Sequence, residues 1–170
     1  MSMQICVLAD SRLASIAEWQ KAIDVEGFPL QLSDADSNVN LAARLPNEET
    51  SIEYGIYDFS ELKETCKDIS FGRDWRYAIA FTWSTDFSEE IAAWMAATAY
   101  ARATDGVVFD EQEGRLFTPE ESLQMTREIE RRRPEMEAML RSYVERLAAT
   151  SPEIGEALQA VIQGRSPKND

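Results

Sequence analysis

Short apolar segments separated by polar turns run through the first two thirds of the chain. Residues 76–83 show a clear period of two, with large side chains on one face and small ones on the other, which is typical of a strand. Residues 3–9 form an apolar run that contains β-branched side chains. The pattern predicts strands at residues 3–9, 28–32, 50–59, 76–83, 107–110 and 115–117.

Two helices are predicted between these strands. Ser15 and Glu18 have the spacing of a capping box, and Gly27 is a natural stop, so a helix is expected over residues 15–27. A second, alanine-rich helix is expected over residues 88–103.

The last third of the chain is predicted to be helical. The motif Thr118-Pro119-Glu120-Glu121 offers an N-cap threonine, proline at the first helical position and an acidic side chain two residues later. Pro134 is expected to interrupt or kink this helix. A further helix should then run to about residue 149, and a short one should occupy residues 151–164.

The polar segment 33–49 is predicted to be a loop. Its residues 34–40 begin like a calcium-binding loop, with the pattern DxDxN. An EF-hand loop also needs glycine at its sixth position and glutamate at its twelfth, and here those positions hold Val39 and Leu45. We therefore interpret the segment as solvated rather than metal-binding.

This order of elements favours the α+β class. With one peripheral hairpin set aside, it fits the ferredoxin-like βαββαβ pattern, an antiparallel sheet with helices on one face, followed by a C-terminal helical extension. The expected organisation is an α+β sheet domain over residues 1–117 and a helical extension over residues 118–170, packed on the same domain.

Composition excludes several kinds of site. The 170 residues carry 31 acidic and 17 basic side chains, a formal net charge of −14, and no histidine. Without imidazole, the common Ser-His-Asp and Cys-His arrangements lack their general base. Cys6 and Cys66 cannot complete a structural zinc site, and we interpret them as two thiols, one disulfide being the alternative. We therefore expect no enzyme activity, no metal and no cofactor.

No segment is suited to a membrane or to nucleic acid. The longest apolar run, residues 91–97, is far shorter than the ~18 residues of a membrane span, and the start of the chain lacks the basic region of a signal peptide. The negative charge opposes binding to a phosphate backbone. The basic run 131–133 lies among glutamates at helical salt-bridge spacing. These features lead us to expect a cytoplasmic protein.

Four carboxylates near residues 105–113 are a candidate cation site. Paired carboxylates bind hard cations or act as acid and base. The favoured interpretation is structural, because Asp105-Gly106 and the segment 110–114 are typical of turns between short strands. The four residues are Asp105, Asp110, Glu111 and Glu113.

The surplus of acidic side chains carries the functional prediction, with simple solubility as its alternative. A strong negative field speeds encounter with a basic partner. A dense acidic group follows the strand predicted at 50–59 and its flanks, where Lys63 is the only base. Trp75 has loop-like neighbours and is a candidate for an exposed anchor, although a core position is the favoured interpretation. The predicted partner-binding residues are Glu48, Glu49, Glu53, Asp58, Glu61, Glu64 and Trp75.

Two stretches of the chain resemble a known group of proteins. Residues 13–30 (LASIAEWQKAIDVEGFPL) and 104–121 (TDGVVFDEQEGRLFTPEE) are similar to a group of small bacterial proteins, some of which accompany secreted toxins as immunity proteins. The matching residues are caps, turns and core positions, so the resemblance implies a shared fold and identifies no catalytic residue.

Three functions follow from these observations. The leading hypothesis is a binding protein, most concretely an immunity protein that neutralises a basic bacterial toxin. The second is an enzyme that uses the carboxylates near 105–113 and a divalent cation. The third is a structural adaptor that presents its C-terminal helices to a partner.

Overall fold

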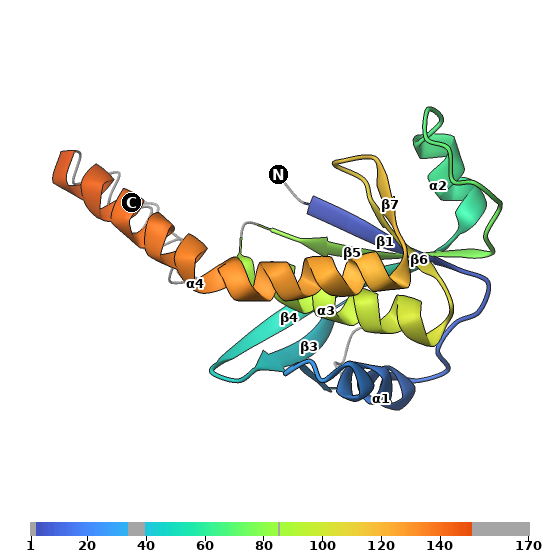
Figure 1. Cartoon of the computed structure of the whole chain (residues 1–170), viewed down its shortest axis with the longest axis horizontal. Helices are drawn as coiled ribbons and strands as arrows, with labels where there is room; N and C mark the ends of the chain where they lie inside the picture. Colours follow the sequence, from blue (N-terminus) through green and yellow to red (C-terminus); the bar gives the residue numbers. More distant parts are fainter. Residues whose placement is uncertain (1–2, 34–39, 85, 151–170) are drawn as a thin grey trace, which may run out of the picture. The chain divides into compact units, whose positions relative to one another are not determined.

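The computed structural model describes residues 3–33, 40–84 and 86–150. The chain divides into two compact units, Met1–Glu128 and Ile129–Asp170, and each is described by itself. The first unit contains the entire sheet and the helices that pack on it (Figure 1).

The described residues form one antiparallel sheet of seven strands, in the order β2-β3-β4-β5-β1-β6-β7. The strands are β1 (Met3–Ala9), β2 (Gln31–Ser33), β3 (Asn40–Leu45), β4 (Glu48–Asp58), β5 (Tyr77–Trp83), β6 (Val107–Asp110) and β7 (Arg115–Phe117). The helices are α1 (Ile16–Glu26), α2 (Phe59–Thr65), α3 (Phe87–Ala103) and α4 (Pro119–Thr150).

The predicted α+β class and the antiparallel sheet are confirmed, and a C-terminal helix is present. The ferredoxin-like topology is not confirmed, because the order of the seven strands differs from the order of that fold. The expectation that helices occupy one face is also wrong: α2 packs on the face opposite α1 and α3 (Figure 1).

Helix α1 begins and ends where its caps predict. The Ser15 hydroxyl accepts a hydrogen bond from the backbone N–H of Glu18 at 3.2 Å, and Gly27 ends the helix in the left-handed conformation, at φ 68°, which glycine adopts without strain. Both ends of this helix are therefore fixed by interactions between residues close in sequence.

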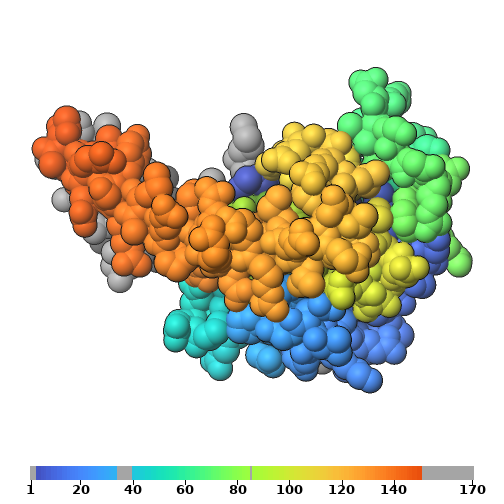
Figure 2. All heavy atoms as spheres, viewed as in Figure 1, coloured from blue at the N-terminus to red at the C-terminus, as the bar shows by residue number. Residues whose placement is uncertain are grey.

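Trp19 joins α1 to both the sheet and α3. Its side chain is 3 % exposed, and its ring makes edge-to-face contacts with Tyr54, Phe81 and Tyr100 at centroid distances of 5.4, 5.6 and 5.3 Å. Its indole N–H donates to the carbonyl oxygen of Ala96 at 3.0 Å. In Figure 2 side chains of α1, in blue, are part of the visible surface, beside side chains of β3 and β4 in teal.

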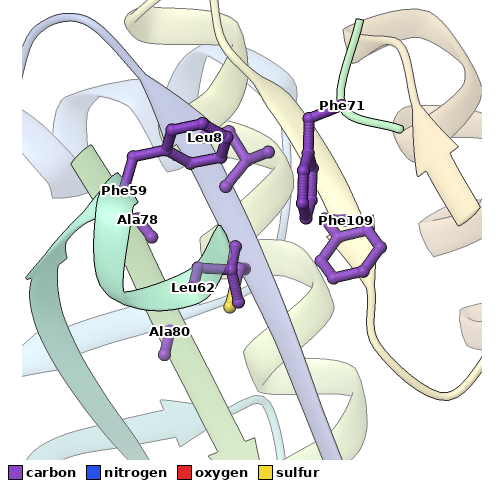
Figure 3. Packing of buried hydrophobic residues seen from close by; sticks show 8 residues of the cluster. Leu8, Phe59, Leu62, Phe71, Ala78, Ala80 and Phe109 are labelled. Carbon is purple, nitrogen blue, oxygen red and sulfur yellow. The ribbon is translucent and has the colours of Figure 1, made fainter. Parts of the chain in front are cut away.

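A second apolar cluster lies on the other face of the sheet, under α2 (Figure 3). Phe71 is its centre, because its ring makes edge-to-face contacts with Phe59 at 5.2 Å and Phe109 at 5.0 Å. The buried members of the cluster are Cys6, Leu8, Phe59, Leu62, Phe71, Ala78, Ala80 and Phe109.

Several elements of this unit differ from the sequence-based expectation. The loop predicted over 33–49 is wrong for residues 40–45, which form β3, and for Ser33, Glu48 and Glu49, which belong to β2 and β4. Of the strand predicted at 28–32, only residues 31 and 32 are part of β2. Leu41, Ala43 and Leu45 are buried in β3 and alternate with exposed side chains, a period of two that the sequence contains. Helix α2 was not predicted, because its seven residues are too few to show helical periodicity.

The capping box expected at the start of α4 is present. The Thr118 hydroxyl accepts from the backbone N–H of Glu121 at 3.2 Å, and the Glu121 carboxylate accepts from the backbone N–H of Thr118 at 2.8 Å. The second hydrogen bond lowers the pKa of Glu121. Further along, the hydroxyls of Thr98 and Thr126 form a buried hydrogen bond of 2.8 Å, which joins α3 to the first turns of α4.

Helix α4 continues through Pro134 to Thr150, so the helix is not interrupted at the proline, and the separate helix predicted up to about residue 149 is part of α4. The helix predicted over 151–164 lies outside the described residues. None of the helices in the described ranges has an apolar stretch long enough to cross a membrane.

Candidate functional site

The sheet presents polar side chains on the face opposite α1 and α3, beyond the area that α2 covers. Side chains alternate along β4, so Ile52 is buried beneath the helices whereas Ser51 and Glu53 are exposed on the other side. We call this area the open face, and define it by Gln4, Arg44, Glu49, Ser51, Glu53 and Thr82.

The strand register aligns a row of polar residues across four strands of the open face. Asn40 on β3 lies opposite Glu53 on β4, Glu53 lies opposite Thr82 on β5, and Thr82 lies opposite Gln4 on β1. Side chains opposite each other in such pairs are about 5 Å apart at Cβ. The row therefore gathers residues from distant parts of the sequence into one band of hydrogen-bonding groups.

The band continues to a carboxylate at the end of β6. The Gln4 amide donates to Glu111 Oε1 at 2.6 Å, and the Thr82 hydroxyl donates to Gln4 Oε1 at 3.2 Å. The Cys6 thiol donates to the same Glu111 oxygen at 3.4 Å. Gln4 and Thr82 were not identified from the sequence, because only the register of three strands brings them to Glu111.

Both cysteines are free thiols, and both lie near this carboxylate. Burial, and then the negative charge of Glu111, raise the pKa of Cys6, whose side chain is buried in the cluster under α2. The same two causes raise the pKa of Cys66, which is partly buried against that cluster. A raised pKa leaves little thiolate at neutral pH, so this environment does not activate either thiol as a nucleophile.

We expect the two thiols of the folded protein to react with iodoacetamide at different rates at pH 8. Cys66 should be alkylated more slowly than in the urea-unfolded chain, and Cys6 should stay unmodified until the protein unfolds, because it is both buried and protonated. Peptide mass spectrometry over time measures both rates. Equal rates for the two cysteines in the folded protein would contradict this picture.

The structure places the predicted acidic residues along β4 and α2, but not in one patch. Ten steps of about 3.3 Å separate Glu48 from Asp58, so the two ends of β4 are about 33 Å apart. Glu49 shares the open face with Glu53 and forms an exposed ion pair with Arg44 at 3.5 Å. Glu48 lies near the β3–β4 turn, opposite Leu45.

Four of the predicted carboxylates lie between the middle of β4 and α2. Glu53 is on the open face, whereas Asp58, five residues further along, is on the opposite side of the sheet. All four are exposed, and none forms an ion pair with a basic side chain in the described part of the chain. Lys63, which lies among them, forms its ion pair with Asp74 instead, at 2.6 Å. We call these four residues the acidic surface: Glu53, Asp58, Glu61 and Glu64.

Trp75 is half-buried and does not stand out from the surface. Its side chain packs against the cluster under α2, and the Arg73 guanidinium lies over its ring at 3.5 Å from the centroid. Arg73 in turn forms an ion pair with Asp10 at 2.7 Å. The ring is therefore covered on one side by the core and on the other by an arginine, which leaves little area for a partner.

The carboxylates near 105–113 have separate roles. Asp110 accepts from the backbone N–H groups of Gln112 and Glu113 at 2.9 and 3.3 Å and so closes the β6–β7 turn. Asp105 ends α3 with a positive φ of 52°, whereas Glu111 belongs to the polar band. Within the described ranges, no three Cys, Asp or Glu side chains are placed to hold a metal ion. The calcium-like pattern at 34–39 lies outside those ranges.

A hollow of about 500 Å³ lies between α1, α3 and the start of α4. Its floor includes Ala22 and Ala99. Three of the charged residues that line it are joined to one another, since Arg102 donates to Glu26 at 2.6 Å and to Glu120 at 3.1 Å.

Comparison with known proteins identifies no relative. No protein-family model, curated protein sequence or solved structure matches this chain significantly.

Proposed function

We propose that the chain is a non-catalytic binding protein that holds a basic protein partner at its acidic surface, and more narrowly an immunity protein that neutralises a basic bacterial toxin. The observation that carries the proposal is the acidic surface, in which Glu53, Asp58, Glu61 and Glu64 are exposed and have no cationic partner among the described residues.

Electrostatics explains why such a surface favours a basic partner. Internal ion pairs cancel much of the field of a charged side chain, whereas four unpaired carboxylates in a chain of net charge −14 leave a field that attracts positive charge. Such fields raise association rates and are weakened by salt. Toxins that act on nucleic acid need a basic cleft for phosphates, and a carboxylate surface can occupy that cleft.

The test uses the full chain and, as its probe, the purified product of the reading frame next to this chain's gene. Association is measured at low and high salt. The variant Glu53→Gln, Asp58→Asn, Glu61→Gln and Glu64→Gln keeps side-chain shape but removes four charges, and should slow association at low salt by about tenfold or more.

A matched control removes four charges elsewhere on the surface, by Asp24→Asn, Glu113→Gln, Glu135→Gln and Glu145→Gln. It changes the net charge equally but leaves the acidic surface intact, so its effect should be clearly smaller. Equal association rates for the two variants, or no binding of the probe by the unmodified chain, would contradict the proposal. Protection of cells that co-express the probe would support the immunity function.

A further inference from the structure

Two arginines converge on one tyrosine at the end of the sheet where β5 begins. The guanidinium carbon of Arg12 lies 4.8 Å from the centroid of the Tyr77 ring, and that of Arg76 lies 5.1 Å from it. Arg12 comes from the segment after β1, whereas Arg76 directly precedes β5. Both side chains are exposed. We call these three residues the arginine–tyrosine cluster.

The two guanidinium groups lack a carboxylate partner. In the part of the chain that the structure describes, neither Arg12 nor Arg76 forms an ion pair. The neighbouring carboxylate of Asp10 is already engaged, because it accepts from Arg73 Nη1 at 2.7 Å and from the backbone N–H of Arg76 at 3.2 Å.

The arrangement holds the two arginines ready for an anion. A guanidinium that stacks on an aromatic ring keeps the N–H donors at its edge available, and these donors match the oxygens of a carboxylate or phosphate. Stacking also limits the rotamers of a flexible side chain before a ligand arrives, which reduces the entropy cost of binding.

Two further observations favour a protein carboxylate over a nucleic-acid phosphate. Ile56 is 41 % exposed and lies on the same side of the sheet as Tyr77, two pairs along the register, so an apolar side chain lies near the cluster. Asp58 lies opposite Tyr77 and belongs to the acidic surface. A polyanion such as nucleic acid would be repelled by the unpaired carboxylates and by the net charge of −14. A single carboxylate on an otherwise basic protein would be repelled much less, because the positive charges around it are attracted.

We propose that the arginine–tyrosine cluster, with Ile56 near it, is a docking site for a segment of a protein partner that carries a carboxylate next to an apolar side chain. The inference extends the proposed function, since the segment is assigned to the basic partner that the acidic surface attracts. The acidic surface then supplies attraction, and the cluster fixes the orientation of the bound partner, because arginine and tyrosine are enriched at interface hot spots.

The test measures binding of a short peptide to the ¹⁵N-labelled full chain by NMR titration. The probe is acetyl-Leu-Glu-Phe-Glu-Leu-amide, and its glutamine twin, acetyl-Leu-Gln-Phe-Gln-Leu-amide, is the neutral control. The acidic peptide should shift the signals of Arg12, Arg76 and Tyr77 saturably, and its Kd should be about tenfold or more below that of the glutamine twin.

Variants identify the groups responsible. Arg12→Gln/Arg76→Gln should raise the Kd of the acidic peptide by about tenfold or more. Arg12→Lys/Arg76→Lys should raise the Kd by an intermediate factor, because lysine keeps the positive charge but lacks the planar donors of arginine. The control Arg44→Gln/Arg115→Gln also removes two positive charges, but at arginines that form ion pairs with Glu49 and Glu121. It should change the Kd of the acidic peptide less than twofold. A similar loss in this control would overturn the inference.

Two outcomes separate this inference from the proposed function. If the acidic peptide does not bind, or if inorganic phosphate binds the cluster more tightly than the peptide does, the docking site proposed here is wrong, but attraction of a basic partner is untouched. Conversely, neutralising the acidic surface should leave peptide binding unchanged or stronger, so failure of the basic-partner experiment does not affect the peptide result.

Discussion

Replacing Trp19 with alanine is expected to lower the free energy of unfolding by about 3–5 kcal/mol. The indole is 3 % exposed and is in contact with rings from β4, β5 and α3, so its removal leaves a cavity where three elements meet. The lost hydrogen bond to the carbonyl oxygen of Ala96 adds to this cost. Urea unfolding followed by far-ultraviolet circular dichroism measures the change.

Val25 provides a matched control on the same helix. Its side chain is 75 % exposed, so Val25→Ala should change the free energy of unfolding by no more than about 0.5 kcal/mol. A loss below about 1 kcal/mol for Trp19→Ala would show that α1 contributes little to the core, and that the packing around this ring has been overestimated.

The elements that were predicted accurately from the sequence are those determined by interactions between residues close together in the chain. Helix α1 and the start of α4 were predicted closely, because their caps are hydrogen bonds between residues three apart in sequence. The strand β3 was missed because its alanine and arginine positions weaken an alternation that becomes plain only when Leu41 and Leu45 are seen to be buried. Strand order depends on pairings between distant segments, which no local pattern determines.

The candidate site divides in the same way. Asp58, Glu61 and Glu64 could be found as a group because they follow one another in the chain, and β4 and α2 are continuous. The polar band of Gln4, Thr82 and Glu111 could not be predicted from the sequence, because it depends on the register of β1 against β5 and on where β6 ends. For the same reason, the sequence did not indicate that Arg12 and Arg76 share the ring of Tyr77.

Replacing Phe71 with alanine is expected to lower the free energy of unfolding by about 3 kcal/mol and to loosen α2 more than the rest of the unit. Seven residues are too few for a helix to be stable alone, so α2 depends on the packing of Phe59 and Leu62 in the cluster. Phe71 is 8 % exposed and connects Phe59 to Phe109 on β6, as Figure 3 shows.

Native-state hydrogen exchange distinguishes this local effect from a global one. In Phe71→Ala, the amides of α2 should lose more protection than those of α3, whose packing around Trp19 lies on the other side of the sheet. Ser70→Ala, at the exposed neighbouring position, should leave both helices unchanged within about 0.5 kcal/mol. Since α2 carries Glu61 and Glu64, loosening it should also spread the charges of the acidic surface and, under the function proposed above, slow association with a basic partner. Equal loss of protection in α2 and α3 would instead mean that the two apolar clusters unfold as one, so that the acidic surface is as rigid as the sheet.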